Sequence, residues 1–482
     1  MRKLVGVLSI LAFTLTSVQS AAAGSTQWSI FEDAAHLVFT SPEQRSATLA
    51  ELRGLGADTI RVQLGWSSVA PNPKSRRRPS FDARDPAAYP GFAPYDDLVA
   101  RATADGFRVL ITITGDAPRW ATAGSRGRNY KPSASAFGAF AAAVGRRYSG
   151  AFSGLPKVSY WSIWNEPNLP RFLRPQSARS PAGAVYRGLV NAAVSSLRAT
   201  NPGAKVFGGE FEPVHTRVGA GPLGFIRSWL CLDKRYRLLR GGVARRAGCR
   251  KFRKVRLDGL AIHAYTRPIS RYRPKGDSVT LYVIRRLARE LDLAARANRI
   301  PRRLPIFNTE FGIQTNPPDP FQGGSLSRQA KIINESEEFS YRYSRLKSFA
   351  QYLLYDDPRR PGPAFVRWSG FQSGLRFASG KKKPAYDAYR FPIVVHRRGG
   401  HVRIWGRVRP GEGDRFAQLQ RKRGKRYVNA GARVKTNALG YFNVNRPLGT
   451  YRFLAYTSPS GASSGAGVTL LGKSRTAKPI PW

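Results

Sequence analysis

Residues 158–164 read Val-Ser-Tyr-Trp-Ser-Ile-Trp, and the chain continues directly with Asn165-Glu166-Pro167-Asn168. Aromatic and β-branched residues dominate this run, which is typical of a buried strand. An Ala- and Val-rich stretch follows at residues 182–199, and its composition and length favour a helix. We therefore predict a strand–helix unit whose strand leads directly into a glutamate.

The same alternation recurs along the chain up to residue 390. The predicted strands are residues 28–31, 59–64, 109–114, 158–164, 205–209, 257–265, 305–309 and 349–355. The predicted helices are residues 42–55, 93–104, 135–147, 182–199, 279–297 and 327–346. Strands that alternate with helices build parallel βαβ units. Eight such strands within residues 25–390 predict an α/β fold, a (β/α)8 TIM barrel.

The composition changes in the last part of the chain, residues 391–482. Short alternating runs separated by turn residues replace the helical stretches, at residues 401–408, 416–420, 434–436, 441–444 and 451–456. This pattern predicts a small all-β domain, an immunoglobulin-like sandwich. We expect the final residues, 473–482, to form a loose end.

The N-terminus has the features of a signal peptide over residues 1–23. Arg2 and Lys3 precede an apolar run at residues 4–18, and small residues follow at Ala21-Ala22-Ala23. The apolar run is shorter than the ~20 residues that a membrane span needs. We therefore expect a secreted, extracellular protein with no membrane span.

The two cysteines, Cys231 and Cys249, lie in the long insertion between the fifth and sixth predicted strands. In an oxidising compartment such a pair usually forms a disulfide bond. Two free thiols are the alternative.

The charge is strongly positive, since 80 Lys and Arg against 29 Asp and Glu give a formal net charge of +51. Such a chain is attracted to polyanions. The charge either covers solvated faces or retains the protein on an anionic cell-wall polymer. No nucleic-acid-binding motif occurs, so no nucleic acid partner is expected.

The five histidines lack metal-ligand spacing, and no metal or cofactor is expected. We expect a monomer.

Two predicted strands end on glutamates that would meet over the barrel. The fourth leads to Glu166, and the seventh to Glu310 in Phe307-Asn308-Thr309-Glu310. Chemistry in a TIM barrel takes place at the C-terminal strand ends, and strands four and seven lie nearly across the mouth. Two facing carboxylates suit the cleavage of a glycosidic bond. Other carboxylates at strand ends are the rivals Glu210 and Glu212, and the sugar-contact candidates Glu32 and Asp33.

The sequences Trp164-Asn165-Glu166-Pro167 and Thr309-Glu310-Phe311-Gly312 resemble those of clan-A glycoside hydrolases. This clan includes the cellulase-like family 5 and the xylosidase-like family 39. Arg61 of the second strand, and His263 and Tyr265 of the sixth, resemble further motifs of the clan. One position departs from it, because Tyr355 stands near the end of strand eight where the clan often has a sugar-stacking tryptophan.

The resemblance implies a retaining double displacement on an oligo- or polysaccharide. Glu310 would be the nucleophile and Glu166 the acid/base, with their carboxyl groups ~5–5.5 Å apart. Asn165 would bind the sugar 2-hydroxyl, Tyr265 would orient Glu310, and Arg61 would stabilise its charge. His263, Trp120 and Tyr355 complete the predicted substrate-binding set.

Two alternatives remain open at this point. One is a non-catalytic carbohydrate-binding or cell-wall-associated protein on a TIM-barrel scaffold. The other is a transglycosylase that uses the same two glutamates.

Overall fold

The computed structural model describes residues 27–123, 127–177, 182–214, 219–269, 271–410, 414–458 and 468–481. The predicted signal peptide, residues 1–23, lies outside the described residues. Within the described ranges, no helix combines the length and apolarity that a membrane crossing requires.

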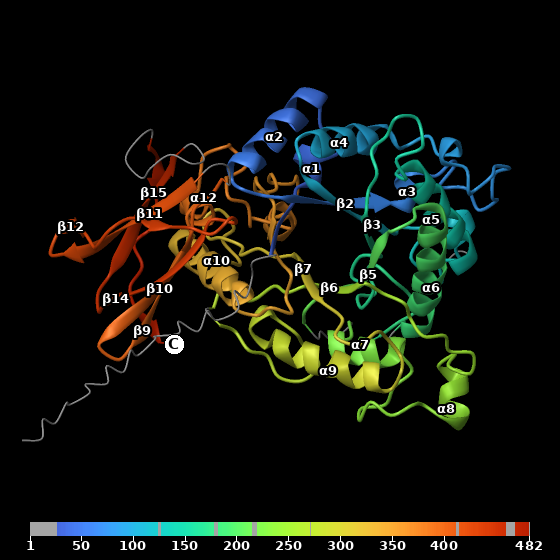
Figure 1. The fold of residues 1–482 in the computed structure, drawn as a ribbon. Helices are drawn as coiled ribbons and strands as arrows, with labels where there is room; N and C mark the ends of the chain where they lie inside the picture. Colours follow the sequence, from blue (N-terminus) through green and yellow to red (C-terminus); the bar gives the residue numbers. More distant parts are fainter. Residues whose placement is uncertain are drawn as a thin grey trace, which may run out of the picture.

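Eight strands form one parallel sheet in the order β7-β6-β5-β4-β3-β2-β1-β8. They are β1 (Trp28–Glu32), β2 (Thr59–Gly65), β3 (Arg108–Thr114), β4 (Tyr160–Ile163), β5 (Lys205–Phe211), β6 (Gly259–His263), β7 (Ile306–Glu310) and β8 (Ser348–Tyr352). Backbone bonds from Tyr352 N to Phe311 O (2.7 Å) and from Lys347 N to Ile306 O (2.8 Å) bring the two end strands together. The predicted TIM barrel is confirmed (Figure 1).

The helices surround the strands in the order that βαβ units require (Figure 1). Serine side chains cap α2, α5 and α10 at their N-termini, where Ser41, Ser133 and Ser325 accept backbone N–H bonds. The longer helices are α2 (Pro42–Gly54), α4 (Ala93–Ala104), α5 (Ala134–Arg147), α6 (Gly183–Thr200), α7 (Pro222–Trp229), α9 (Ile284–Arg296), α10 (Leu326–Tyr341) and α12 (Pro384–Arg390). Short helices are α1 (Ala34–Leu37), α3 (Trp66–Val69), α8 (Gly241–Arg246) and α11 (Ala364–Arg367).

An aromatic cluster fills the barrel interior toward the strand beginnings. Trp28 packs edge-on against Tyr160, and Phe207 stacks on Phe307 with ring centroids 4.2 Å apart. Trp28 also contacts Phe307. Because this cluster occupies that half of the barrel, the polar residues farther along the strands face the opposite, C-terminal mouth.

The insertion between β5 and β6 carries α7 and α8. A disulfide bond joins Cys231 to Cys249 across this insertion, with the two Cα atoms 5.8 Å apart. A small apolar cluster surrounds the bond, including Ala244 and Leu239. The predicted pairing of the two cysteines is therefore present in the structure.

The C-terminal part is all β, as predicted. One sheet has the order β14-β10-β9-β17 and the other β12-β11-β15-β16, with β13 paired to β11. The strands are β9 (Ile393–Arg398), β10 (His401–Arg407), β11 (Asp414–Arg423), β12 (Arg426–Asn429), β13 (Val434–Lys435), β14 (Tyr441–Pro447), β15 (Tyr451–Ser458), β16 (Thr469–Lys473) and β17 (Ile480–Pro481).

The expectation of a loose C-terminal end is wrong for the described residues up to 481. Ser474 accepts a bond from Phe453 N (2.8 Å), and Tyr451 and Ala477 exchange backbone bonds of 3.0 and 2.8 Å. Strand β17 then pairs with β9. The tail is ordered because it supplies partners to strand edges that would otherwise lack them. Trp482 lies outside the described residues.

A buried ionic cluster joins the sandwich to the barrel. Glu337 on α10 accepts bonds from Arg409 (2.6 and 3.0 Å) and from Arg407 (3.1 Å). Tyr441 donates a further bond to it (3.2 Å), and Ser29 on β1 accepts from Arg407 (2.7 Å). Residues from the barrel and from the sandwich thus form one buried network of hydrogen bonds and ion pairs.

Candidate active site

The turn after β4 directs Glu166 toward the barrel mouth. Trp164 and Glu166 both have positive φ, 64° and 40°, which is unusual for residues other than glycine. The indole of Trp164 is buried and donates to Phe172 O (3.1 Å), while Glu166 N donates to Glu210 O (2.9 Å). Strained backbone held by such contacts clusters at functional sites.

Two irregularities in the sheet direct further side chains inward. The register shifts next to Glu210 on β5, where φ is 52°, and again at His263 on β6. A bulge changes the direction of a side chain and often lies beside an active site. Both residues consequently enter the network around Arg61.

Glu310, at the end of β7, is held through both of its carboxylate oxygens. Arg61 Nη1 donates to Oε2 (2.9 Å), and the Tyr265 hydroxyl donates to Oε1 (2.7 Å). These two bonds fix the plane of the carboxylate.

Arg61 is fully buried among three carboxylates. It forms ion pairs with Glu32, with Glu210 (3.3 Å) and with Glu310 (2.9 Å), and its Nη2 donates to Asn165 Oδ1 (3.0 Å). Burial alone would lower the pKa of Arg61, but the three carboxylates outweigh it and raise that pKa. Arg61 is therefore a fixed cation beneath the mouth.

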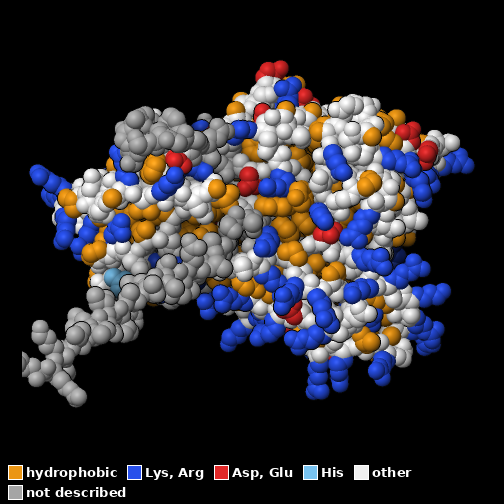
Figure 2. All heavy atoms as spheres, viewed as in Figure 1, with side chains coloured by type: hydrophobic (Ala, Val, Ile, Leu, Met, Phe, Trp, Pro, Cys, Tyr) orange, Lys and Arg blue, Asp and Glu red, His pale blue; other side chains and the backbone are white. Residues whose placement is uncertain are grey.

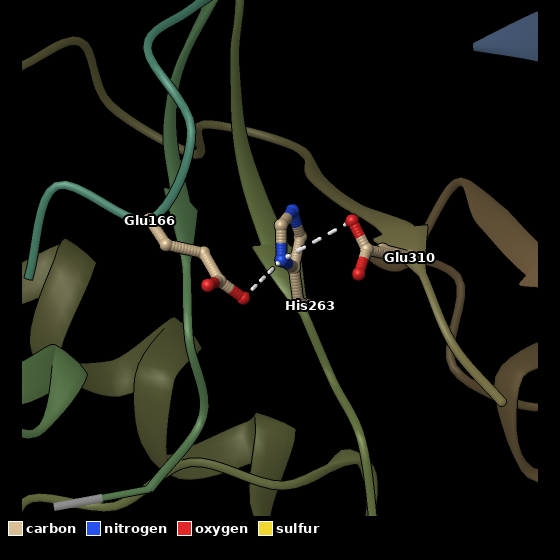
Figure 3. A group of neighbouring side chains, drawn as sticks. All are labelled: Glu166, His263 and Glu310. Atoms are coloured by element: carbon tan, nitrogen blue, oxygen red, sulfur yellow. Dashed lines mark hydrogen bonds and ion pairs between the residues drawn. The ribbon is translucent and has the colours of Figure 1, made fainter. Parts of the chain in front are cut away.

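His263 lies between Glu166 and Glu310, as Figure 3 shows. Its Nδ1 is 2.9 Å from Glu166 Oε1 and 3.5 Å from Glu310 Oε2, and its Nε2 is 2.9 Å from Glu210 Oε2. Burial opposes its charge, but the charge of Glu310 and the bonds to Glu166 and Glu210 raise the pKa of His263 to about 10. Both ring nitrogens then carry protons and donate.

The neighbouring carboxyl groups have separated pKa values. Burial raises the pKa of Glu32 to about 7, although Arg61 opposes the shift. Burial also raises the pKa of Glu212 to about 8, with a further contribution from the charge of Glu166. Burial would raise the pKa of Glu210 as well, but Arg61 and His263 outweigh it and lower that pKa to about 2. Such separation is typical of acid–base sites.

A cleft of about 440 Å³ opens above this network, and Glu166, Glu310 and Tyr265 line it. Three carboxylates reach it, because Glu212 also forms part of the wall. Aromatic walls suit the apolar faces of sugar rings. The aromatic residues of the lining are Phe172, Tyr265, Tyr272 and Phe371.

Of the six predicted substrate contacts only Tyr265 lines this cleft. Arg61, Asn165 and His263 lie in the network beneath it, and the rings of Trp120 and Tyr355 lie elsewhere. Trp120 donates from its indole to Pro71 O (3.2 Å) and packs edge-on against the buried Trp66. Tyr355 stacks on His36, with ring centroids 4.3 Å apart. Phe172 and Phe371 line the cleft instead, and both come from loops whose paths the sequence pattern does not predict.

Glu32 and Asp33 lie below the cleft rather than in it. Glu32 is paired with Arg61 and accepts from Gln63 (2.8 Å). Asp33 caps α1 and accepts from Leu354 N (3.0 Å). Both therefore support the loops and side chains of the site from beneath.

Glu166, His263 and Glu310 could each offer one atom to a metal ion, with the three atoms within 4.8 Å of one another. Both nitrogens of His263 already bond carboxylates, so a metal ion here would have to displace the proton of Nδ1.

No protein-family model matches the sequence, and no curated protein matches it. Solved structures do resemble the fold. A family 39 glycoside hydrolase from Bacteroides cellulosilyticus WH2 is 17% identical, with a TM-score of 0.52, over 88% of this chain and 80% of that chain. A family 5 (subfamily 18) enzyme from Streptomyces cattleya in complex with GlcNAc is 17% identical, with a TM-score of 0.47, over 76% and 79%. An endo-1,4-β-mannanase from Rhizomucor miehei is 11% identical, with a TM-score of 0.44, over 76% and 95%.

The structural neighbours are glycoside hydrolases of clan A, and the resemblance seen in the sequence is confirmed at the level of the fold. At identities of 11–17% the likeness concerns the fold alone. The evidence for it is the superposition on the family 39 enzyme.

Proposed function

We propose that the chain is a secreted retaining glycoside hydrolase that cleaves O-glycosidic bonds by double displacement. The observation that carries the proposal is the pair Glu166 and Glu310, which line one cleft and have one carboxylate oxygen each within 4.8 Å of the other. Carboxyl groups ~5–5.5 Å apart favour retention, whereas inversion needs ~6.5–9.5 Å so that a water molecule fits between them.

In the first step Glu310 is the nucleophile. Its carboxylate attacks the anomeric carbon while the bond to the glycosidic oxygen breaks, and Glu166 donates a proton to that oxygen. Tyr265 and Arg61 hold the Glu310 carboxylate in position for this attack. The leaving group departs as an alcohol, and a glycosyl ester of Glu310 remains.

In the second step Glu166 accepts a proton from water, whose oxygen attacks the same anomeric carbon. The ester bond breaks, Glu310 is restored and Glu166 is again protonated. The cation of His263 lies next to both glutamates and stabilises the carboxylate of Glu310 in the first step and that of Glu166 in the second. The side-chain oxygen of Asn165 bonds Arg61, which leaves its NH2 group as the donor for the sugar 2-hydroxyl.

Secretion is part of the proposal. The features of residues 1–23 support it, and the disulfide bond is compatible with an oxidising compartment.

The test is hydrolysis of a panel of aryl β-glycosides and polysaccharides by wild type, Glu310→Gln and the surface control Glu43→Gln. We expect Glu310→Gln to lose about 10³-fold or more of the activity, because the amide is a poor nucleophile, and Glu43→Gln to keep it. Proton NMR of the first product should show the β anomer.

Azide provides a second readout that separates the two roles. With an activated aryl glycoside, Glu310→Ala should yield the α-glycosyl azide and Glu166→Ala the β-glycosyl azide. Unchanged hydrolysis in Glu310→Gln would overturn the proposal. A folded wild type that binds glycans and cleaves none would favour a carbohydrate-binding protein.

A further inference from the structure

The catalytic cleft continues into a second hollow, a basin of about 780 Å³. Val214, Arg267 and Tyr272 belong to the walls of both cavities, so the two share one boundary. Thr280 donates to Tyr272 O (2.9 Å) and fixes the segment that forms this boundary. A chain of sugars that leaves the cleft on this side would enter the basin.

The two cavities differ in their acidic residues. The cleft is lined by Glu166, Glu212 and Glu310 together with Arg171 and Arg267, whereas Asp277 is the single acid in the lining of the basin. Asp277 is already neutralised, because Arg227 contacts both of its oxygens at 2.8 Å.

Three further cations line the basin, namely Lys234, Arg267 and Lys275. Among the described residues none of them forms an ion pair. The guanidinium of Arg267 lies over the ring of Tyr272, 5.2 Å from its centroid. This leaves three exposed positive groups around the space next to the cleft.

Lys and Arg side chains are common on the face drawn in Figure 2, above all in the part near α8 and α9. An excess of 51 positive charges makes scattered basic residues expected. The basin differs from those residues in its place, because it shares a wall with the cleft that Glu166 and Glu310 line.

We propose that the substrate is an anionic polysaccharide, and this inference rests on the proposed glycosidase function. Its neutral sugar occupies the cleft between Glu166 and Glu310, and an acidic group on an adjoining sugar lies in the basin near Lys234, Arg267 and Lys275. Carboxylates of uronic acids and sulfate esters share the chemistry that these cations recognise.

The test uses matched polymers. β-Linked polysaccharides that carry uronates are compared with the same polymers after carboxyl reduction, and sulfated ones with their desulfated forms. We expect the wild type to cleave one anionic class with a kcat/KM at least about fivefold above its neutral counterpart. This preference should fall when the ionic strength is raised about tenfold. The two arms show which acidic group is recognised.

The variant Lys234→Gln/Lys275→Gln tests the basin itself. We expect it to lose about fivefold of the preference for the anionic form. The control Lys422→Gln/Lys425→Gln removes the same charge from exposed positions on the sandwich and should keep the preference.

Two results would overturn the inference while the glycosidase proposal stands: equal cleavage of both forms, or equal behaviour of basin and control variants. If no polymer is cleaved, the glycosidase proposal fails separately. Affinity electrophoresis of the three proteins in the anionic polymers then tests the basin, and equal retardation of the two variants would refute it.

Discussion

The protein contains two buried arginine–glutamate clusters with opposite composition. At the barrel mouth one arginine, Arg61, is surrounded by three carboxylates, those of Glu32, Glu210 and Glu310. Between barrel and sandwich one carboxylate, Glu337, is held by the two arginines Arg407 and Arg409. All of these side chains are buried.

The difference determines what each cluster can do. Where carboxylates are in excess, some of them hold protons near neutral pH, as the raised pKa of Glu32 (about 7) indicates. Where arginines are in excess, the surplus charge does not titrate, because guanidinium stays protonated. The mouth cluster also lies beneath an open cleft and the interface cluster does not. The first is thus suited to chemistry and the second to holding two parts of the chain together.

The largest expected effect on stability comes from Glu337→Gln. The change leaves Arg407 and Arg409 buried without a counter-charge, which should lower the free energy of unfolding by about 3–5 kcal/mol. Urea unfolding measures it, with the exposed Glu43→Gln as a control. If the free energy of unfolding fell by less than about 1 kcal/mol, Arg407 and Arg409 would have found other partners. The interface cluster would then not be the one that holds the two parts of the chain together.

Tyr265→Phe should have the opposite effect to Glu337→Gln, because it should lower activity and leave stability nearly unchanged. It removes one of the two bonds to Glu310 and keeps the ring, so kcat should fall about 10–100-fold while stability changes little. Tyr427→Phe, at an exposed hydroxyl of the sandwich, is the matched control. If kcat stays at the wild-type level while the protein loses stability, Tyr265 is structural and not a positioning residue for Glu310.

Much of the barrel could be predicted because its strands and helices differ in composition and alternate regularly. The strand ends then assigned Glu166, Glu310, Arg61, His263 and Tyr265 to one face, and the structure brings these five together. Their convergence follows in large part from topology, since parallel strands of a barrel present their C-terminal ends at one mouth, and the register shift at His263 adds to it.

Other features depend on contacts that a sequence pattern does not contain. Trp120 lies in a short 3-10 helix (Arg119–Ala121) and Tyr355 in a loop, and these segments turn their rings to Trp66 and His36. The inward direction of Glu210 comes from a register shift. In the sandwich, strands such as β12, Arg-Tyr-Val-Asn, are too short and too charged to show alternation, and their pairing depends on distant strands.

The smallest expected effect is on the pH dependence of stability and activity, and it concerns Glu212. Like Glu32, this residue at the mouth has a carboxyl group whose pKa is raised by burial. Its pKa of about 8 exceeds the ordinary value of 4.5, so the folded state binds the proton more tightly than the unfolded state. Its contribution to stability is full below about pH 4.5 and is lost as the pH rises through 8.

Glu212→Gln imitates the protonated form at every pH. The stability of the variant relative to wild type should therefore grow between pH 5 and 9, by on the order of 2 kcal/mol. In wild type, the ionisation of Glu212 places a negative charge beside Glu166, which should also produce a decline in kcat/KM above about pH 8. The decline should be absent from the variant, and thermal melts and pH–rate profiles measure the two effects. If wild type and Glu212→Gln had identical pH profiles, Glu212 would already be ionised at neutral pH. Burial would then not keep its carboxyl group protonated.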